Sequence, residues 1–425
     1  MTPVTVRHLT IGSGIPGIIV PVMEETADAF LNSLEAAVRT APDMLEIRLD
    51  SFENLNDGGA VIQLLKDVRR SAGDLPLLVT VRTAQEGGRA DLCQADYETV
   101  IGRILDSCEA DLIDLEYCRA TPALCRAAAE KSVPVVMSFH DFGGVPSDEK
   151  LEETLAGMSE KGAAVLKIAA MAHSREDADR LMKAARRFSW QYEQPIIMIA
   201  MGKEGEVSRI AGERTGSCLT FASAGKASAP GQIEVRKMRT LLNGVHRIRQ
   251  SDRLLYLTGF MGSGKSAAAR ELGRMTGQFV CDMDQMIEEA AGCTISEIFD
   301  REGEEGFRAR ETAVLEELSR DKGGIISCGG GVVLRPENRI LMRRSGDVIL
   351  LKASPETIIK RLESEADKRP LLRAPDRSER IRSLMEERRK CYEDAANLSI
   401  ITDGLDAEET AREIILMVEN EYEVG

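Results

Sequence analysis

Short apolar runs recur over the first 245 residues, and a longer mixture of apolar and charged positions follows most of them. The runs have the length of buried strands, and the mixtures repeat their apolar positions with the period of an amphipathic helix. The predicted strands are residues 18–22, 44–49, 77–81, 111–115, 134–139, 165–169, 195–200 and 218–222. Strands that alternate with helices in this way predict an α/β domain over residues 1–245, a (β/α)8 TIM barrel. An open doubly wound sheet is the alternative, but no G-x-G-x-x-G segment follows the first strand.

A second pattern begins at residue 254, where the apolar strand 254–258 runs into a glycine-rich loop and then a helix over 267–275. The loop has the form G-x-x-x-x-G-K-S, and its N–H groups at Gly262, Ser263 and Gly264 predict a cradle for the phosphates of ATP. In such loops the lysine, here Lys265, reaches the β- and γ-phosphates, and Ser266 holds Mg²⁺. Residues 253–425 are therefore predicted to be a P-loop domain, an NTPase or a kinase, with an α/β/α arrangement around a parallel sheet. Residues 245–252 are predicted to be a short basic connector.

Composition excludes several classes of protein. The chain has 425 residues, of which 43% are hydrophobic and 29% charged, and its net charge of −15 argues against a nucleic-acid partner. The cysteines are scattered without a C-x-x-C pair, which favours reduced thiols over a zinc site or a disulfide framework. No apolar run reaches the roughly 18 residues of a membrane span, and the first residues do not form a signal peptide. We therefore expect a cytoplasmic protein with no membrane partner.

Charged side chains occur where the predicted barrel strands end, the edge at which such barrels place their chemistry. A single charged strand end is more often a structural ion pair, but several at matching ends favour a site. Lys167 is flanked by apolar strand residues, so partial desolvation favours a neutral amine that can attack a carbonyl carbon. His140 lies one strand earlier and could move protons to and from the adduct. The sequence thus predicts Schiff-base chemistry, supported by the other charged strand ends, Glu46, Arg48 and Arg82.

The barrel resembles type I 3-dehydroquinate dehydratase over residues 15–245. The resemblance rests on Glu46-Ile47-Arg48 and on residues 82–88, 138–142, 167–172, 201–202, 208–209 and 227–232. It implies that Lys167 forms an imine with the C3 ketone of 3-dehydroquinate, that His140 shuttles protons while Glu86 orients its imidazole, and that no cofactor is needed. It also implies substrate contacts at the carboxylate end from Arg209, Ser228 and Gln232, and at the hydroxyl face from Glu46, Arg48 and Arg82.

Further motifs narrow the range of functions that the second domain could have. Asp282 and Asp284 end a predicted strand over residues 279–284, and a period of two would place both on one face. Arg308 and Glu311 form a cation–carboxylate pair at helical spacing. Three glycines at 329–331 follow the predicted strand 325–328, so bare backbone can approach a ligand there. Residues 363–377 are charged and rich in turn-forming residues, and we interpret them as a mobile lid that carries an arginine.

This second set resembles shikimate kinase over residues 253–425. The resemblance implies that Asp284 contacts the shikimate hydroxyls and is the base for the attacking 3-hydroxyl, and that Asp282 joins Ser266 at Mg²⁺. The other contacts that it implies are Arg308, Arg388, Gly329, Gly330 and Gly331 with shikimate, Arg361 with adenine, and Arg369 with the transferred phosphoryl group.

Together the two resemblances predict a bifunctional shikimate-pathway enzyme whose substrates are 3-dehydroquinate, shikimate and ATP. The two reactions are not consecutive, so a separate shikimate dehydrogenase must act between them. The alternatives are another Schiff-base lyase such as a class I aldolase, a gluconate or nucleotide kinase, and a non-enzymatic ATP sensor. The charged strand ends, the pairing of Arg308 with the glycine triplet, and the complete catalytic set argue against these in turn. The barrel is the surface through which we would expect a homodimer, although no pattern fixes the oligomeric state.

Overall fold

The computed structural model describes residues 1–225, 231–362 and 377–423. The chain divides into two compact units, residues 1–242 and 243–425. The first unit contains eight parallel strands in the order β10-β3-β4-β5-β6-β7-β8-β9, and a bridge between Ile196 and Ser217 brings the two ends of this sheet together. The predicted TIM barrel is therefore confirmed. Its strands are β3 (Gly17–Val22), β4 (Met44–Arg48), β5 (Leu77–Thr80), β6 (Leu112–Glu116), β7 (Val135–Asp141), β8 (Val165–Met171), β9 (Ile196–Met201) and β10 (Leu219–Phe221).

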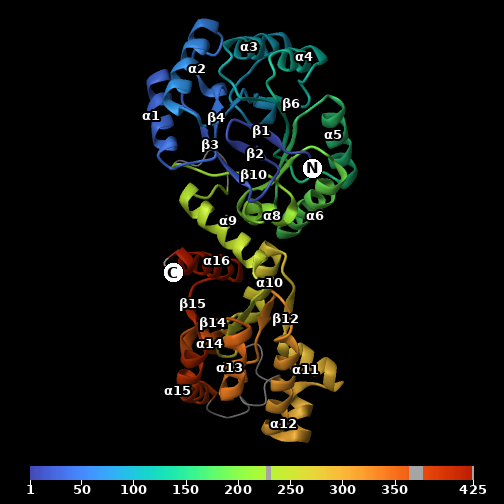
Figure 1. Ribbon diagram of the computed structural model, residues 1–425, viewed down its shortest axis with the longest axis vertical. Coiled ribbons are helices and arrows are strands. Elements are labelled where there is room, and N and C mark those ends of the chain that lie inside the picture. Colours follow the sequence, from blue (N-terminus) through green and yellow to red (C-terminus); the bar gives the residue numbers. More distant parts are fainter. Residues whose placement is uncertain (226–230, 363–376, 424–425) are drawn as a thin grey trace. The chain divides into compact units, whose positions relative to one another are not determined.

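Helices surround the barrel (Figure 1). Several begin directly after a Ser, Thr or Asp whose side chain accepts a hydrogen bond from the first turn, as at Thr26, Asp57, Thr121, Ser147 and Ser174. The helices are α1 (Ala27–Val38), α2 (Gly58–Ala72), α3 (Gln94–Ser107), α4 (Pro122–Glu130), α5 (Asp148–Glu160), α6 (Arg175–Gln191), α7 (Glu206–Ile210), α8 (Gly212–Thr215) and α9 (Val235–Gln250). Short 3-10 turns lie at η1 (Leu49–Ser51), η2 (Ala84–Glu86) and η3 (Lys203–Gly205).

An antiparallel hairpin that the apolar pattern did not predict precedes the barrel. It consists of β1 (Val4–Val6) and β2 (Leu9–Ile11). Val6 and Ile11 are buried in one cluster with residues near the start of several barrel strands, among them Met44 and Leu112. The hairpin therefore closes the amino-terminal end of the barrel and leaves the carboxyl ends of the strands for a site.

The second unit is a five-stranded parallel sheet in the order β12-β13-β11-β14-β15, with helices packed against it. This confirms the predicted parallel sheet of a P-loop kinase. Its strands are β11 (Leu254–Thr258), β12 (Val280–Asp282), β13 (Ile325–Ser327), β14 (Gly346–Lys352) and β15 (Leu398–Ile401). Its helices are α10 (Lys265–Thr276), α11 (Met283–Ala291), α12 (Ile295–Leu318), α13 (Pro336–Ser345), α14 (Pro355–Leu362), α15 (Arg377–Ala395) and α16 (Ala407–Glu423), with a 3-10 turn at η4 (Val332–Leu334).

Two local predictions are wrong. The interpretation of residues 245–252 as a connector fails because α9 continues to Gln250, and Val245 and Ile248 in that stretch are buried. The strand predicted over residues 279–284 ends at Asp282, and Asp284 belongs to the first turn of α11. In the second case Asp282 caps the helix, since its Oδ1 accepts a hydrogen bond from the backbone N–H of Asp284 at 3.1 Å.

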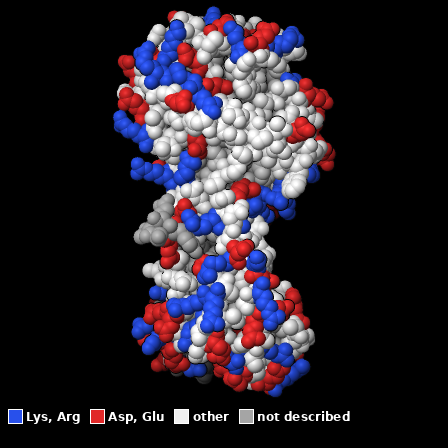
Figure 2. All heavy atoms as spheres, viewed as in Figure 1, with Lys and Arg blue, Asp and Glu red and all other residues white. Residues whose placement is uncertain are grey.

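The surface agrees with the composition. On the face seen in Figure 2, acidic and basic side chains are interspersed over each unit rather than gathered into one basic patch. Among the described residues, none of the helices combines the length and the apolar character that crossing a bilayer requires.

Candidate functional sites

A cavity of about 300 Å³ lies at the carboxyl ends of the barrel strands. Every described residue that was predicted to serve the dehydration lines it, and Ser228 alone of that set lies outside the described residues. The lining residues of the predicted set are Glu46, Arg48, Arg82, Glu86, His140, Lys167, Arg209 and Gln232. The fold thus brings together side chains that are separated by up to 186 residues, from 46 to 232, along the chain.

Lys167 is almost completely buried in this cavity, with a side chain that is 4% exposed. Its Nζ donates to Asp114 Oδ2 at 3.3 Å and lies 3.8 Å from Glu46 Oε1. It also lies 4.7 Å from the centre of the Phe221 ring. The sequence suggested an amine surrounded by apolar residues, but the carboxylates here compensate the cost of burying an ammonium charge.

Glu86 and His140 form a buried pair, with His140 Nδ1 2.8 Å from Glu86 Oε2. Burial raises the pKa of Glu86 to about 8, although the charge of Arg82 opposes this shift. Burial, together with the cations of Arg82 and Lys167, lowers the pKa of His140 well below its ordinary value. Both shifts favour uncharged groups, so a proton is held between Oε2 and Nδ1 at neutral pH and is lost near pH 8.

Arg82 is the centre of a buried network below this pair. Its Nη1 donates to Glu86 Oε2 at 3.1 Å and to Ser138 Oγ at 2.8 Å, and its Nη2 donates to Asp114 Oδ1 at 2.7 Å. A third carboxylate, Glu116, accepts from Nη1 at 3.3 Å. Burial alone would lower the pKa of Arg82, but the surrounding carboxylates raise it above its ordinary value. Arg82 therefore fixes the positions of three carboxylates as well as lining the cavity.

The sequence analysis missed Asp114, Glu116 and Ser138, although the first two could have been found. Asp114 and Glu116 are two residues apart in the buried strand β6, so their side chains lie on the same side of it. The same argument from a period of two failed for Asp282 and Asp284, because Asp284 lies in helix α11 rather than in the strand. A buried strand with two alternating carboxylates requires cations to compensate them, and Arg82 and Lys167 supply those cations.

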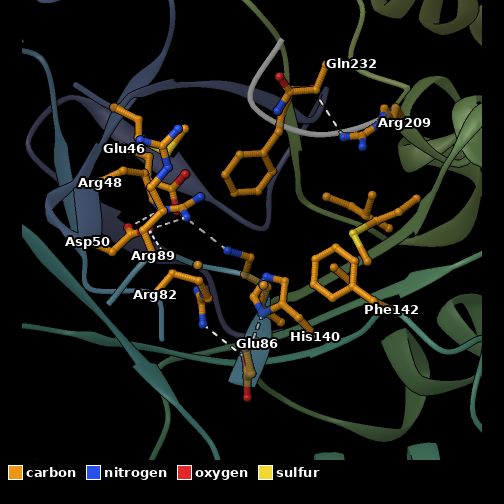
Figure 3. A pocket seen from close by; sticks show the side chains of 18 residues that line it. Glu46, Arg48, Asp50, Arg82, Glu86, Arg89, His140, Phe142, Arg209 and Gln232 are labelled. Atoms are coloured by element: carbon orange, nitrogen blue, oxygen red, sulfur yellow. Dashed lines mark hydrogen bonds and ion pairs between the residues drawn. The ribbon is translucent and has the colours of Figure 1, made fainter. Parts of the chain in front are cut away.

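Cations lie on both sides of the cavity (Figure 3). On one side Arg48 donates from Nε and Nη2 to the two carboxylate oxygens of Asp50, at 2.7 and 2.9 Å. Burial alone would raise the pKa of Asp50, but Arg48 holds it below its ordinary value. On the opposite side Arg209 lies near Gln232, and burial lowers the pKa of Arg209 to about 10. A small, anionic ligand suits this arrangement.

The turn after β5 explains how Glu86 comes to face His140. A Cβ at Gly88 would lie 2.0 Å from the carbonyl oxygen of Arg82, so only glycine lets the chain fold back this closely. Gly87 has a φ of +79°, which also favours glycine. The 3-10 turn Ala84–Glu86 is therefore held over the end of β5, with its carboxylate directed to the barrel interior.

The P-loop lies between β11 and α10, as predicted. Gly264 precedes the helix with a φ of +96°, a conformation that favours glycine. Lys265 Nζ donates to the carbonyl oxygens of Gly259 and Phe260, at 2.9 and 3.1 Å. Ser266 Oγ lies 3.0 Å from Ser327 Oγ, and Ser327 is the strand partner of Asp282. Ser266 and Asp282 are thus brought to the same edge of the sheet, although they lie on different elements.

Arg308, Glu311 and Asp284 gather at the glycine triplet. Arg308 donates from Nη1 to Glu311 and from Nη2 to Glu304, the latter at 3.1 Å. A Cβ at Gly329 would lie 2.5 Å from Glu311 Oε1 and 2.8 Å from Asp284 Oδ1, and one at Gly331 would lie 2.0 Å from Arg308 Nη1. The missing side chains are therefore what gives these charged groups room.

Two polar atoms at this cluster are buried without a hydrogen-bond partner among the described residues, Glu311 Oε1 and Arg308 Nε. Burial raises the pKa of Glu311 to about 7, an effect that Arg308 opposes and Asp284 reinforces. Buried polar atoms of this kind are rare in folded proteins and are often completed by a ligand or water.

Of the remaining predicted kinase residues, the structure describes Arg388 and Arg361. Arg388 is buried, with its charge close enough to Glu311 to affect that carboxyl, and Tyr392 on the same helix donates to the carbonyl of Gly330. Arg361 donates to the carbonyls of Gly262 and Thr402, at 3.3 and 3.0 Å, so it lies against the P-loop. Arg369 and the predicted lid around it lie outside the described residues, apart from residue 377 at the start of α15.

Comparisons with known proteins match the two parts of the chain to two different families. Residues 18–249 match the family model of type I 3-dehydroquinase, and residues 261–419 match that of shikimate kinase. A 3-dehydroquinate dehydratase from Bacillus velezensis is 37% identical over 247 residues, which are 57% of this chain and 98% of the relative.

Two solved structures are also similar to parts of this chain. A type I 3-dehydroquinate dehydratase from Clostridium difficile, with covalently modified comenic acid, has a TM-score of 0.56 and 34% identity, over 58% of this chain and 99% of that chain. A shikimate kinase from Acinetobacter baumannii in complex with shikimate is 32% identical over 42% of this chain and 98% of that chain, with a TM-score of 0.40.

Proposed function

Because the chain belongs to the type I 3-dehydroquinase family and carries a shikimate kinase domain after the barrel in the sequence, we propose which residues carry out each of the two reactions. It is a bifunctional enzyme of the shikimate pathway. One activity removes water from 3-dehydroquinate to give 3-dehydroshikimate, and the other transfers a phosphoryl group from ATP to shikimate.

For the dehydration we propose that Lys167 is the nucleophile. The ammonium group of Lys167 gives a proton to His140, the free Nζ adds to the C3 ketone, and His140 returns the proton as the ketone oxygen leaves as water. The protonated imine that remains withdraws electrons from the adjacent carbon. His140 then takes a proton from that carbon and gives it to the departing hydroxyl group, and hydrolysis of the imine releases Lys167. The observation that supports this best is the burial of Lys167 Nζ in the same cavity as the Glu86–His140 pair.

The cations around the cavity are proposed to hold the substrate. Arg209 and Gln232, with Ser228, bind the carboxylate end, because a buried guanidinium suits a carboxylate. Glu46, Arg48 and Arg82 face the hydroxyl groups, while Arg82 also keeps Glu86 in place.

For the phosphoryl transfer we propose that Asp284 is the base for the 3-hydroxyl, and that Arg308 and Arg388 bind the shikimate carboxylate beside Gly329, Gly330 and Gly331. The unpartnered Nε of Arg308 supports this assignment. The P-loop, residues 262–266, binds the phosphates of ATP, Arg361 contacts adenine, and Arg369 closes over the transferred group.

The residues present fit Mg²⁺. Ser266 and Asp282 offer hydroxyl and carboxylate oxygens, the donors that this hard cation prefers, and Ser266 contacts Ser327, the strand partner of Asp282. When bound, the ion neutralises charge on the phosphates.

Chemical trapping tests the central assignment. Borohydride added together with 3-dehydroquinate should leave a stable adduct on Lys167, identified by peptide mass spectrometry, since a reduced imine cannot hydrolyse. Phosphorylation of shikimate by the same trapped protein should continue. An adduct on another lysine, or none while dehydration proceeds, would contradict the proposal.

A further inference from the structure

The second carboxylate oxygen of Glu86 has a partner that the dehydration scheme does not use. Oε2 is engaged by His140 and Arg82, whereas Oε1 lies 3.7 Å from the sulfur of Cys118, a hydrogen-bonding distance for a thiol. Cys118 follows β6 in the loop that leads to α4, and it is exposed to solvent. A solvent-facing thiol thus reaches the carboxylate that pairs with His140.

The surrounding charges argue against a metal site at this place. Ligand atoms of Glu86, Glu116 and Cys118 do lie within 4.8 Å of one another. However, Arg82 donates to both carboxylates, and Arg119 Nε lies 3.6 Å from Glu116. Because two guanidinium groups already occupy the positions near these oxygens, a cation would be repelled. The contact is better explained as a thiol that donates to a carboxylate.

We propose that Cys118 is a positioning residue for the dehydration, whose thiol donates to Glu86 Oε1 and so helps Glu86 release the proton that it shares with His140. This inference rests on the role proposed above for the Glu86–His140 pair. It assigns to a cysteine outside the substrate cavity an influence on the pH at which the dehydratase becomes active.

The groups around Glu86 determine the direction in which its pKa should change when the thiol is removed. Burial raises the pKa of Glu86, and the negative charges of Glu116 and Asp114 on β6 raise it further. Arg82 from the end of β5 and the thiol of Cys118 lower it, and His140 on β7 shares its proton. Removing the thiol donor should therefore raise the pKa of Glu86, so the pair should lose its proton at a higher pH.

The pH profile of dehydratase kcat/KM tests this inference. In the wild-type protein its rising limb should report proton loss from the pair. Cys118→Val, which keeps the volume without the donor, should move that limb upward by about half a pH unit. Cys118→Ser should restore the wild-type limb, because a hydroxyl group donates as well. Cys125→Ala, on the neighbouring helix α4, should leave the profile unchanged.

A reciprocal measurement does not depend on changing Cys118. Burial and the carboxylates of Glu86 and Glu116 raise the pKa of the Cys118 thiol to about 11. The pKa of Glu86 is about 8, so above pH 8 its carboxylate is charged. In that range Glu86→Gln should therefore speed the alkylation of Cys118 and leave that of Cys125 unchanged. Peptide mass spectrometry measures both rates in one sample.

The outcomes separate this inference from the proposed function. If Glu86→Gln leaves dehydration at the wild-type rate, the role of the pair fails. If the pair is required but Cys118→Val gives a superimposable profile, or lowers activity equally at every pH, only the inference about Cys118 fails. An unchanged alkylation rate in Glu86→Gln would overturn it as well.

Discussion

The two sites use charge differently. In the barrel, cations and carboxylates alternate at the strand ends, so that Arg82 faces Asp114, Glu86 and Glu116, and Lys167 faces Asp114. In the kinase domain the functional groups come from the P-loop, the glycine triplet and several helices, among them α11, α12 and α15. There the charged groups occupy space that the missing side chains of Gly329 and Gly331 leave open.

This difference follows from the two reactions. Imine chemistry requires protons to be stored and moved, so titratable groups are buried close together where small changes alter their charge. Phosphoryl transfer requires mainly positioning and positive charge, so arginines and close backbone approach are sufficient. The comparison predicts that substitutions among the titratable groups around Glu86 and His140 will change proton transfer, whereas substitutions of the kinase-site arginines will change substrate binding.

The largest effect is expected for Lys167→Met, which removes the nucleophile and keeps a long apolar side chain. Dehydration should fall to the background of the uncatalysed reaction, while phosphorylation of shikimate by the same protein should keep its rate. Lys183→Met, an exposed lysine on α6, is the matched control and should leave both activities intact. Substantial dehydration by Lys167→Met would remove the basis of the comparison.

The second effect concerns the kinase site. Arg308→Leu should raise the KM for shikimate by roughly 30- to 5000-fold, the equivalent of about 2–5 kcal/mol for a carboxylate left without its partner. The KM for ATP should barely change, and Asp284→Asn should instead lower kcat. Arg310→Leu, two residues further along α12, removes an exposed ion pair with Glu302 and is the control. A loss of ATP binding in Arg308→Leu, with shikimate unaffected, would reverse the placement of the two substrates.

A smaller effect should appear in the pH dependence of stability. Folding raises the pKa of Glu86 from 4.5 to about 8 and that of Glu311 from 4.5 to about 7. The folded state then holds a proton that the unfolded state has lost, so each contribution to the free energy of unfolding is complete below pH 4.5 and disappears as the pH rises through the folded-state pKa.

Glutamine does not titrate, so it isolates each contribution. The difference in free energy of unfolding between wild type and Glu86→Gln should fall by up to about 1.4 kcal/mol per pH unit, until about pH 8. For Glu311→Gln the fall should end near pH 7. Urea denaturation followed by circular dichroism at several pH values measures both, and a flat difference for either variant would mean that its carboxyl is not shifted.

The last prediction is that one measurable quantity, the consumption of ATP, does not change when 3-dehydroquinate is supplied. The pure protein supplied with 3-dehydroquinate and Mg²⁺-ATP should accumulate 3-dehydroshikimate and consume no ATP, because the kinase needs the reduced compound. Addition of a separate shikimate dehydrogenase and NADPH should start ATP consumption. Shikimate 3-phosphate formed without the added dehydrogenase would show that this chain performs the reduction too.

Sequence patterns predicted the two folds because both depend on periodicity, which the chain carries locally. The barrel strands were placed within two residues of their observed ends, and Lys167, His140 and Glu86 line the predicted cavity. The hairpin β1–β2 was missed because its strands have three residues each, too few for a period of two to be recognised.

Side-chain partners were harder to predict because they depend on contacts between distant segments. Asp114 approaches Lys167 across 53 residues, and Cys118 approaches Glu86 across 32. The basic character of residues 245–252 suggested a short connector, but the apolar positions Val245 and Ile248 in the same stretch are buried. Ser228 and Arg369 lie outside the described residues, so no contact can be given for either.

Helix α9 determines where the chain can be divided if the two enzymes are to be produced separately. The division between the units falls inside it, with Leu242 buried on one side and Ile248 buried on the other. The carbonyl of Ile248 accepts from Gln278 at 2.9 Å, and Arg249 donates to the carbonyl of Thr276. A truncation or a protease cut within residues 245–252 would therefore remove the contacts of Ile248 and Arg249 from the kinase unit. It would also leave an incomplete helix α9 at the end of the dehydratase unit. A clean split would require the whole helix to be duplicated, so that each separated enzyme inherits its own copy.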